Sequence, residues 1–276
     1  MSQRNTQKKQ SARQRVAAER EERRRQSQRR RRLLVIASVL VVLGAAAGIG
    51  YAVSAASAKP LAYPVPSNGS VVVDKYADPS DKPTALSYGS ATAPHTLSIY
   101  EDFRCPFCKA LETGSASVYK SYVDAGTLRV LFHPVTLIDA NHPGTGGSLW
   151  SGSAAVCAAT AGKFDEYHDA LFAGQPDEST DGYRDPATLI AVAKKVPGLD
   201  TPAFESCVTS GTYKGLVQQN MADFNALRLP STPTLLLDGK QLSIPMSFYK
   251  SSPDGKTLTG SDAAMLKQIF QAAGMP

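Results

Sequence analysis

The chain has 276 residues, of which 42% are hydrophobic and 20% are charged, so it can form one large domain or two small ones with a sizeable core. This composition excludes a chain that is disordered throughout, a collagen-like repeat and a polytopic membrane protein. The net charge of +6 is uneven: residues 1–32 carry 13 Lys and Arg against three acidic residues, and the remainder carries 17 against 21. Because the remainder is mildly acidic, a globular nucleic-acid-binding domain is not expected.

The basic tail at 1–32 leads into an uncharged stretch at 33–58. Its most apolar part, Leu33–Val53, would span about 31 Å as a helix, close to the hydrocarbon thickness of a bilayer. Four arginines precede this part and only Lys59 follows the stretch, so the positive-inside rule predicts a cytoplasmic N-terminus and an exported remainder. We therefore expect a single-pass signal-anchor in the cell membrane. The alternative is a secreted protein cleaved near Ala58, because Ala-Ser-Ala at this point has the form of a signal-peptidase site.

The position of the basic tail also indicates whether the tail binds nucleic acid. An arginine-rich arm that binds nucleic acid is the other hypothesis for residues 1–32, but the tail directly abuts an apolar stretch of membrane-spanning length. We therefore expect the membrane, through the N-terminal helix, and no nucleic acid as a partner.

Residues 59–94 have the composition of a linker. Prolines are frequent near its start, and a second Pro/Asp/Ser cluster occupies Asp78–Pro83; such stretches stay extended. Between them, the β-branched run Ser70–Asp74 predicts an edge strand.

Residues 95–276 alternate strand and helix patterns bounded by Gly, Pro and Asp. The order of these patterns predicts an α/β domain whose sheet is interrupted by a helical insertion at about 147–212. The expected strands are His95–Tyr100, Leu128–His133 and Thr234–Lys240, and the expected helices are Lys109–Asp124, Ser148–Ala161, Phe164–Phe172, Pro186–Val196, Tyr213–Leu227 and Asp262–Ala273.

Four cysteines point to redox chemistry: Cys105 and Cys108 in the sequence Cys-Pro-Phe-Cys, and the isolated Cys157 and Cys207. Outside the cytoplasm, cysteines are expected to be oxidised or redox-active. Four cysteines allow three pairings, and only the pairing of 105 with 108 and 157 with 207 leaves the C-x-x-C pair free to cycle. We therefore expect a redox-active dithiol and a separate structural disulfide.

The position of the C-x-x-C pair after a strand explains its reactivity. Cys105 is expected at a helix N-cap, with Pro106 at the first helical position. Unpaired backbone N–H groups and the helix dipole then favour a Cys105 thiolate, which is both a nucleophile and a good leaving group. Cys108 lies one turn further on the same face, so it can attack a mixed disulfide formed at Cys105. Arg104 and Lys109 are expected to add positive potential.

A Cys-x-x-Cys pair can also be a metal site or a structural disulfide. A zinc site would need a second cysteine pair or two histidines, but Cys157 and Cys207 are isolated, and His133 and His142 do not have ligand spacing. A purely structural disulfide across two residues would be strained. We therefore expect no metal.

Three stretches of the domain resemble a known family: Glu101–Cys108 (EDFRCPFC), Ala154–Gln175, and Leu229–Lys240 with its Ser-Thr-Pro-Thr before a strand. From about Pro94 to the C-terminus, the chain is similar to the DsbA-like thiol–disulfide oxidoreductases, which have a thioredoxin fold with a helical insertion. The resemblance does not cover residues 1–70.

The resemblance implies roles for several residues. Pro233 is expected to be cis and to pack against the active-site disulfide, and Thr232 to offer backbone hydrogen bonds to the substrate. Relatives often carry a buried acid six residues before the first cysteine, where this chain has Ile99. The nearest carboxylates are Glu101 and Asp102.

The resemblance also implies a function, which is the introduction of disulfides into reduced, unfolded exported proteins. A membrane redox partner is expected to reoxidise the dithiol, and no bound cofactor is implied. A reductase or isomerase of the same fold is one alternative. A non-catalytic thioredoxin-like binding module of the cell envelope is another.

Overall fold

The computed structural model describes residues 62–77 and 79–276. The predicted basic tail at 1–32 and the predicted membrane span at 33–58 lie outside these residues. Within the described part of the chain, no helix combines the length and the apolar composition needed to cross a bilayer. The membrane anchor therefore stays a prediction.

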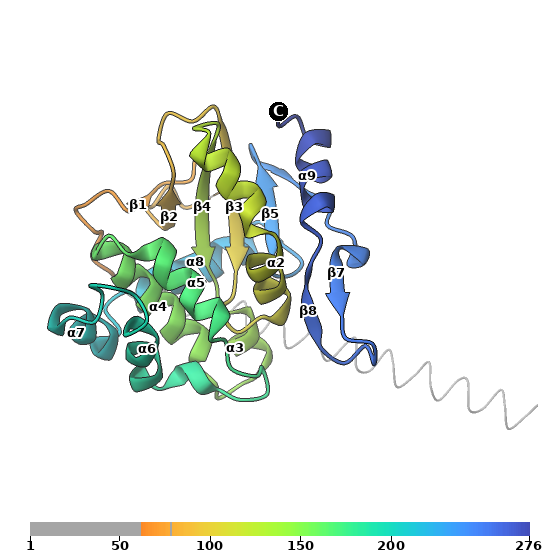
Figure 1. The fold of residues 1–276 in the computed structure, drawn as a ribbon. Helices are drawn as coiled ribbons and strands as arrows, with labels where there is room; N and C mark the ends of the chain where they lie inside the picture. Colours follow the sequence, from red (N-terminus) through yellow and green to blue (C-terminus); the bar gives the residue numbers. More distant parts are fainter. Residues whose placement is uncertain (1–61, 78) are drawn as a thin grey trace, which may run out of the picture. The chain divides into compact units, whose positions relative to one another are not determined.

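A six-stranded mixed sheet forms the centre of the domain, with the strand order β1-β2-β4-β3-β5-β6 (Figure 1). The central pair, β3 and β4, is parallel, and the other neighbouring pairs of this sheet are antiparallel. The strands are β1 (Val71–Val72), β2 (Ala85–Tyr88), β3 (His95–Glu101), β4 (Leu128–Pro134), β5 (Thr234–Leu237) and β6 (Lys240–Gln241). The expected α/β architecture is thus present.

Strand β2 is a second strand within residues 59–94, where a linker with one edge strand was expected. Leu86 of this strand is fully buried and pairs with Phe132 of β4. Four residues are too few to show a strand period, so the sequence pattern missed them. The predicted edge strand is present at Val71–Val72, paired with β2. The sheet therefore begins before Pro94.

A buried polar contact fixes the segment after β1 to the sheet. The Asp74 carboxylate accepts a hydrogen bond from the Ser98 hydroxyl of β3 and lies 3.1 Å from Nε2 of His133 in β4. These three residues are fully buried. Burial opposes the ionisation of Asp74, but the hydrogen bond and charge of His133 outweigh it and lower the pKa of the carboxyl group. The carboxylate therefore holds this segment across the two central strands.

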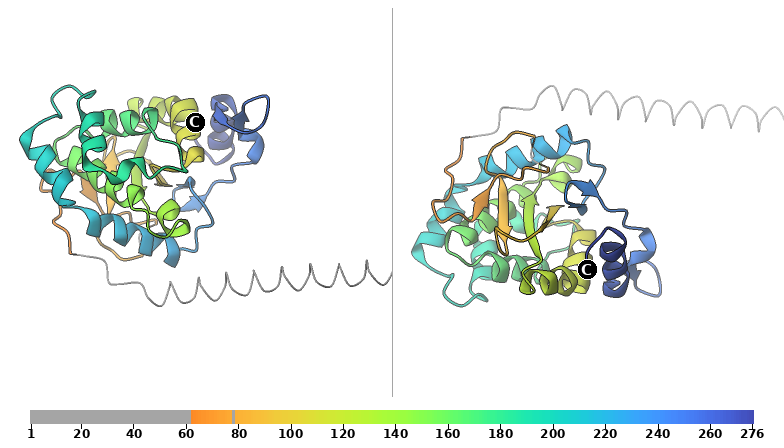
Figure 2. Two further views of the ribbon diagram at one scale, coloured as in Figure 1. Left: turned by 90° about the horizontal axis from the view of Figure 1, so that it is seen from below. Right: turned by 90° about the horizontal axis from the view of Figure 1, so that it is seen from above.

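Helices cover both faces of the sheet, with α2 (Pro106–Asp124) and α9 (Ala263–Ala272) on one face and α8 (Lys214–Ala226) on the other (Figure 2). Successive side chains of β3 alternate between these faces. Leu97 and Ile99 belong to the larger core, which contains the buried side of α2, whereas Tyr100 packs against Phe224 of α8. Because Glu101 has the same parity as Ile99, its side chain also enters the α2 face.

The chain between β4 and α8 forms the predicted helical insertion, gathered to one side of the sheet in Figure 1. Its helices are α3 (Leu137–Asn141), α4 (Gly147–Thr160), α5 (Phe164–Ala173), α6 (Pro186–Ala193) and α7 (Pro202–Ser210). Helix α4 is buried along most of its length, and its small side chains let α5, α7 and α8 pack closely around it. Helices α3 and α7 were not predicted from the sequence. For α7 a signal was present, because Thr201 caps the helix and Pro202 opens it.

A short antiparallel hairpin lies beside the N-terminal half of α2 in Figure 1. Its strands are β7 (Tyr249–Ser251) and β8 (Leu258–Ser261). The hairpin was not predicted from the sequence, because both strands are short and mostly polar. The hairpin occupies the connection between β6 and α9.

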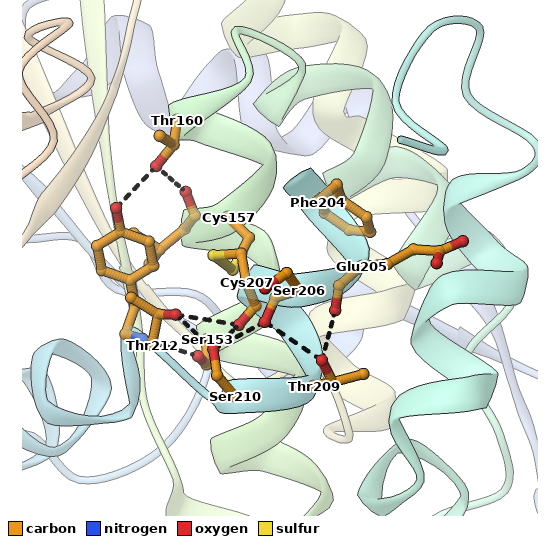
Figure 3. Close-up of a disulfide and its surroundings, with 12 residues drawn as sticks. Ser153, Cys157, Thr160, Phe204, Glu205, Ser206, Cys207, Thr209, Ser210 and Thr212 are labelled. Atoms are coloured by element: carbon orange, nitrogen blue, oxygen red, sulfur yellow. Dashed lines mark hydrogen bonds between the residues drawn. A yellow bond between two sulfur atoms is a disulfide. The ribbon is translucent and has the colours of Figure 1, made fainter. Parts of the chain in front are cut away.

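The structural disulfide joins Cys157 of α4 to Cys207 of α7, as expected, with the two Cα atoms 6.0 Å apart (Figure 3). Cys157 is buried in the insertion core. The hydroxyl groups of Ser210 and Thr212 donate hydrogen bonds to the carbonyl oxygen of Cys207, which closes the end of α7. The bond therefore links the most buried helix of the insertion to a peripheral one.

Removing this disulfide should destabilise the domain without altering the C-x-x-C pair. The bond closes a loop across 50 residues, for which the chain-entropy model gives roughly 4 kcal/mol. We expect the double variant Cys157→Ala/Cys207→Ala to unfold at a lower temperature, measured by circular dichroism, while the alkylation rate of Cys105 stays unchanged. An unchanged melting temperature, or mass spectra of the native protein with the two cysteines unlinked, would contradict this expectation.

Candidate active site

The loop between β3 and α2 carries the C-x-x-C pair, which therefore lies at the carboxyl end of β3. Cys105 is the N-cap of α2, with extended backbone angles (φ −74°, ψ 121°), and Pro106 follows at the first helical position, as predicted. The buried Asp102 carboxylate accepts hydrogen bonds from the backbone N–H groups of Arg104 and Ile138, at 2.9 Å each. This carboxylate therefore ties the cysteine loop to the first turn of α3.

The two thiols lie in different environments. Cys105 is 4% exposed and Cys108 is fully buried. Hydrogen bonds from the side chain and the backbone N–H of Cys108 favour the thiolate of Cys105 and, against the effect of burial, lower the pKa of this thiol. Burial raises the pKa of Cys108, and the adjacent Cys105 raises it further. The environment thus favours the thiolate at the outer cysteine and the thiol at the inner one.

The loop before β5 lies against Cys105. The peptide bond between Thr232 and Pro233 is cis, as the resemblance implied, and the Cys105 thiol donates a 3.4 Å hydrogen bond to the carbonyl oxygen of Thr232. Antiparallel pairing of β5 with β3 brings this loop to the cysteines, because Thr234 lies opposite Tyr100. The structure therefore brings together residues that are more than a hundred positions apart in the sequence.

Arg104 does not have the role expected of it. Its guanidinium group is buried, with Nη1 lying 2.7 Å from Oδ1 of Asp139 and 3.2 Å from Oδ1 of Asp181. These carboxylates neutralise the positive charge of the guanidinium group, so Arg104 does not supply free positive potential to Cys105. Its role here is to join the cysteine loop to the insertion.

Gln175 is a site residue that the sequence analysis did not single out. Its side-chain amide donates hydrogen bonds to the carbonyl oxygens of Phe103 and Cys105, at 2.9 and 3.0 Å. The backbone carbonyl oxygen of Gln175 accepts a 3.4 Å hydrogen bond from Nζ of Lys109. The available signal was its place at the end of the Ala154–Gln175 stretch that resembles the family.

A buried charge cluster lies behind the dithiol. It consists of Glu101 of β3, Glu112 and Tyr119 of α2, and His168 of α5, all nearly or fully buried. Nε2 of His168 lies 2.9 Å from Oε1 of Glu101, and the Tyr119 hydroxyl donates to Glu112. Glu112 follows Cys108 by one helical turn. The family's usual acid position is Ile99 here, and the buried carboxylates enter instead from Glu101 and from the helix.

The cluster shifts the pKa values of its members. Burial raises the pKa of Glu112 to about 8. Burial alone would lower the pKa of His168, but the Glu101 carboxylate raises it to about 10. Among the described residues, Glu101, Glu112 and His168 also have ligand atoms within 4.8 Å of one another, close enough to hold a metal ion. Nε2 of His168 bonds to Oε1 of Glu101, and Oε2 of Glu112 accepts from Tyr119. Within the part of the chain that the structure describes, Oε2 of Glu101 and Oε1 of Glu112 have no hydrogen-bond partner.

Replacing Glu112 should change how the stability of the domain depends on pH. Because the pKa of Glu112 is about 8 in the folded protein, its contribution to stability is complete below its ordinary pKa near 4.5 and is lost as the pH rises through 8. Glu112→Gln cannot ionise, so its melting temperature relative to the native protein should rise between pH 5 and pH 9. The exposed Glu205→Gln is the control. A temperature difference independent of pH would show that the carboxyl group is not buried as described.

Comparison with known proteins extends this description. Residues 81–252 match the sequence model of a family described as thioredoxin. The fold is similar to the reduced form of the disulfide bond oxidoreductase DsbG from Mycobacterium tuberculosis, with 26% identity, a TM-score of 0.53, and coverage of 72% of this chain and 90% of that one. It is also similar to oxidised DsbA from the same organism, with 25% identity, a TM-score of 0.52, and coverage of 69% and 93%.

Curated relatives match over part of their length. One is the Na(+)/H(+) antiporter NhaA 3 of Salinispora tropica, 30% identical over 153 residues, which are 55% of this chain and 21% of the relative. Another is the serine/threonine-protein kinase PknE of Mycobacterium tuberculosis, 28% identical over 154 residues, which are 51% of this chain and 27% of the kinase. The chain thus spans about a fifth to a quarter of these relatives. The fold of the chain is similar to those of DsbA- and DsbG-type thiol–disulfide oxidoreductases. The family match covers more than half of the chain, which therefore belongs to the thioredoxin family.

Proposed function

We propose that the protein is a membrane-anchored, extracytoplasmic dithiol oxidase that introduces disulfide bonds into exported proteins. The supporting observation is the contrast between the two thiols, since hydrogen bonds lower the pKa of Cys105 while burial raises that of Cys108. A stable Cys105 thiolate stabilises the reduced form of the pair, which makes the disulfide more oxidising. The direction of catalysis follows from this stability.

The proposed reaction begins with a disulfide between Cys105 and Cys108. A substrate thiolate attacks the sulfur of Cys105, a new sulfur–sulfur bond forms, and the bond to Cys108 breaks. The electron pair stays on Cys108, which takes up a proton. A second substrate thiolate then attacks the substrate sulfur of the mixed disulfide and releases Cys105 as a thiolate. The substrate leaves oxidised, and the two electrons remain on the dithiol.

The low exposure of Cys105 suits this sequence of steps. With 4% of its surface exposed, the sulfur is reached only by an extended, flexible segment, as in an unfolded protein. Thr232 contributes its backbone next to the sulfur, which favours recognition of substrate main chain over particular side chains. We propose reduced, unfolded exported proteins as substrates and a membrane redox partner as the acceptor of the two electrons, with no bound cofactor.

A reductase or isomerase of the same fold is the second candidate, because the fold is similar to both a DsbA and a DsbG. The reduction potential separates the two. The reduction potential of thioredoxin is about −270 mV. An oxidase has a potential above this value, whereas a reductase maintained by a membrane donor does not need so high a potential.

Equilibration with glutathione should therefore give a potential above that of thioredoxin. The oxidised protein should also restore activity to a reduced, denatured disulfide-containing enzyme, and Cys105→Ala should abolish this oxidation. Cys157→Ala/Cys207→Ala is the matched control, because it removes two cysteines and leaves the dithiol. A potential below that of thioredoxin, together with reduction of insulin disulfides, would move the assignment to the reductase.

The proposed location has its own test. We expect the full-length protein to stay in membranes after washing with alkaline carbonate, because residues 33–58 carry no charge and have spanning length. Protease added outside the cells should cleave the domain. Recovery of a soluble form that begins at Lys59 would show that the segment is a cleaved signal peptide.

A further inference from the structure

The buried charge cluster behind the dithiol contains carboxylate oxygens that no hydrogen bond satisfies. Glu101 and His168 are fully buried, and Glu112 is 7% exposed. Among the residues that the structure describes, Oε2 of Glu101 and Oε1 of Glu112 are buried without a hydrogen-bond partner. Burying such an oxygen is costly, because it loses its hydrogen bonds to water. Two of them in one cluster point to a cation as their partner.

The three residues have the chemistry and the spacing of a metal site. One ligand atom of each lies within 4.8 Å of the ligand atoms of the other two. Imidazole nitrogen and carboxylate oxygen both bind zinc at about 2.0–2.2 Å, so the ligand atoms around a tetrahedral ion lie about 3.4 Å apart. Nε2 of His168 and Oε1 of Glu101 are already 2.9 Å apart. A small rotation of a carboxyl group therefore brings all three ligand atoms to bonding distance of one ion.

The neighbours of these side chains hold them as metal ligands are usually held. The Tyr119 hydroxyl donates a hydrogen bond to Oε2 of Glu112, which leaves Oε1 for an ion. Nδ1 of His168 lies 3.6 Å from Oδ1 of Asp169, and metal-binding histidines commonly direct their second ring nitrogen toward a carboxylate. Four phenylalanine rings also pack against the imidazole ring, from Phe103, Phe132, Phe164 and Phe172. The orientation of the imidazole ring is thus fixed by its surroundings.

We propose that Glu101, Glu112 and His168 form a structural site for a divalent transition-metal ion of the zinc type. The ion takes the place of the proton between His168 and Glu101 and binds the free oxygen of Glu112. Two carboxylates and a neutral imidazole then balance the charge of the ion within the core.

The proposed site joins three elements around the cysteine loop. Glu101 ends β3, Glu112 lies one turn beyond Cys108 in α2, and His168 belongs to α5 of the insertion. A bound ion therefore fixes the strand before the loop, the helix after it and the insertion. No step of thiol–disulfide exchange passes through the ion, so the inference goes beyond the proposed function and does not depend on the direction of catalysis.

The test measures metal binding by a full-length variant without the dithiol, Cys105→Ser/Cys108→Ser, because cysteine pairs can themselves bind zinc. The protein is produced with Zn²⁺ present, since a buried site is loaded as the domain folds, and is purified in detergent. We expect one zinc ion per chain, measured by elemental analysis and by native mass spectrometry. Its melting temperature should exceed that of the same variant produced with a chelator, because an ion that binds only the folded state stabilises it.

Two further variants in the same background, Glu112→Gln and His168→Gln, each remove one ligand. We expect them to retain at least about tenfold less zinc and to lose the effect of the ion on the melting temperature. Glu205→Gln, at an exposed position of α7, is the matched control and should keep the ion. Circular dichroism checks that each variant is folded.

Absence of zinc from the folded dithiol-free protein would show that the inference is wrong. Equal zinc contents in folded Glu112→Gln and Glu205→Gln would show the same. Failure of the native protein to oxidise substrates would contradict the proposed oxidase function and leave the inference standing, because the protein tested for metal has no dithiol.

Discussion

The chemistry of the site depends on one structural constraint, which is that helix α2 begins at Cys105. The first backbone N–H groups of a helix have no partner within the helix, and this end of the helix dipole is positive. Asp102 fixes the loop from one side and Gln175 from the other, so the cysteine stays at the N-cap position. The second cysteine, one turn into the helix, is then necessarily buried. A difference in pKa between two chemically identical thiols follows from their positions along a single turn.

The parts of this site that are local in sequence could be predicted from it. An alternating strand, a cysteine followed by proline, and a helical pattern were enough to place Cys105 at the N-cap. The role of Arg104 could not be predicted, because its partners Asp139 and Asp181 lie far along the chain and only the packing of the insertion brings them together. Proximity in sequence suggested that its charge serves the neighbouring cysteine, whereas tertiary contacts direct that charge away from it.

The charge cluster could not be predicted from the sequence either. Glu101, Glu112 and His168 come from a strand and two helices, and each sits in a pattern that a solvent-facing residue would also fit. Burial brings them into one cluster, in which their ligand atoms lie within 4.8 Å of one another. The fold class was predictable because strand and helix periods repeat along the chain, but β2 and the β7–β8 hairpin were not, since two to four residues carry no measurable period. Their positions are set by pairing with partners elsewhere in the chain.

Gly114 of α2 lies against the backbone of Ser261 in β8, where a Cβ atom on the glycine would be 2.5 Å from the Ser261 nitrogen, and this contact affects how relatives of this protein can diverge. The family match ends at residue 252, inside the hairpin, so β8 belongs to the part of the chain that the family pattern does not describe. A glycine in the middle of α2 is costly for the helix, and here it admits the backbone of this added strand. A lineage that lengthens, shortens or loses the hairpin can therefore change the surroundings of the dithiol while its two cysteines and the residues between them stay the same. The reduction potential of the dithiol in such proteins would then vary independently of the sequence of the Cys-x-x-Cys motif.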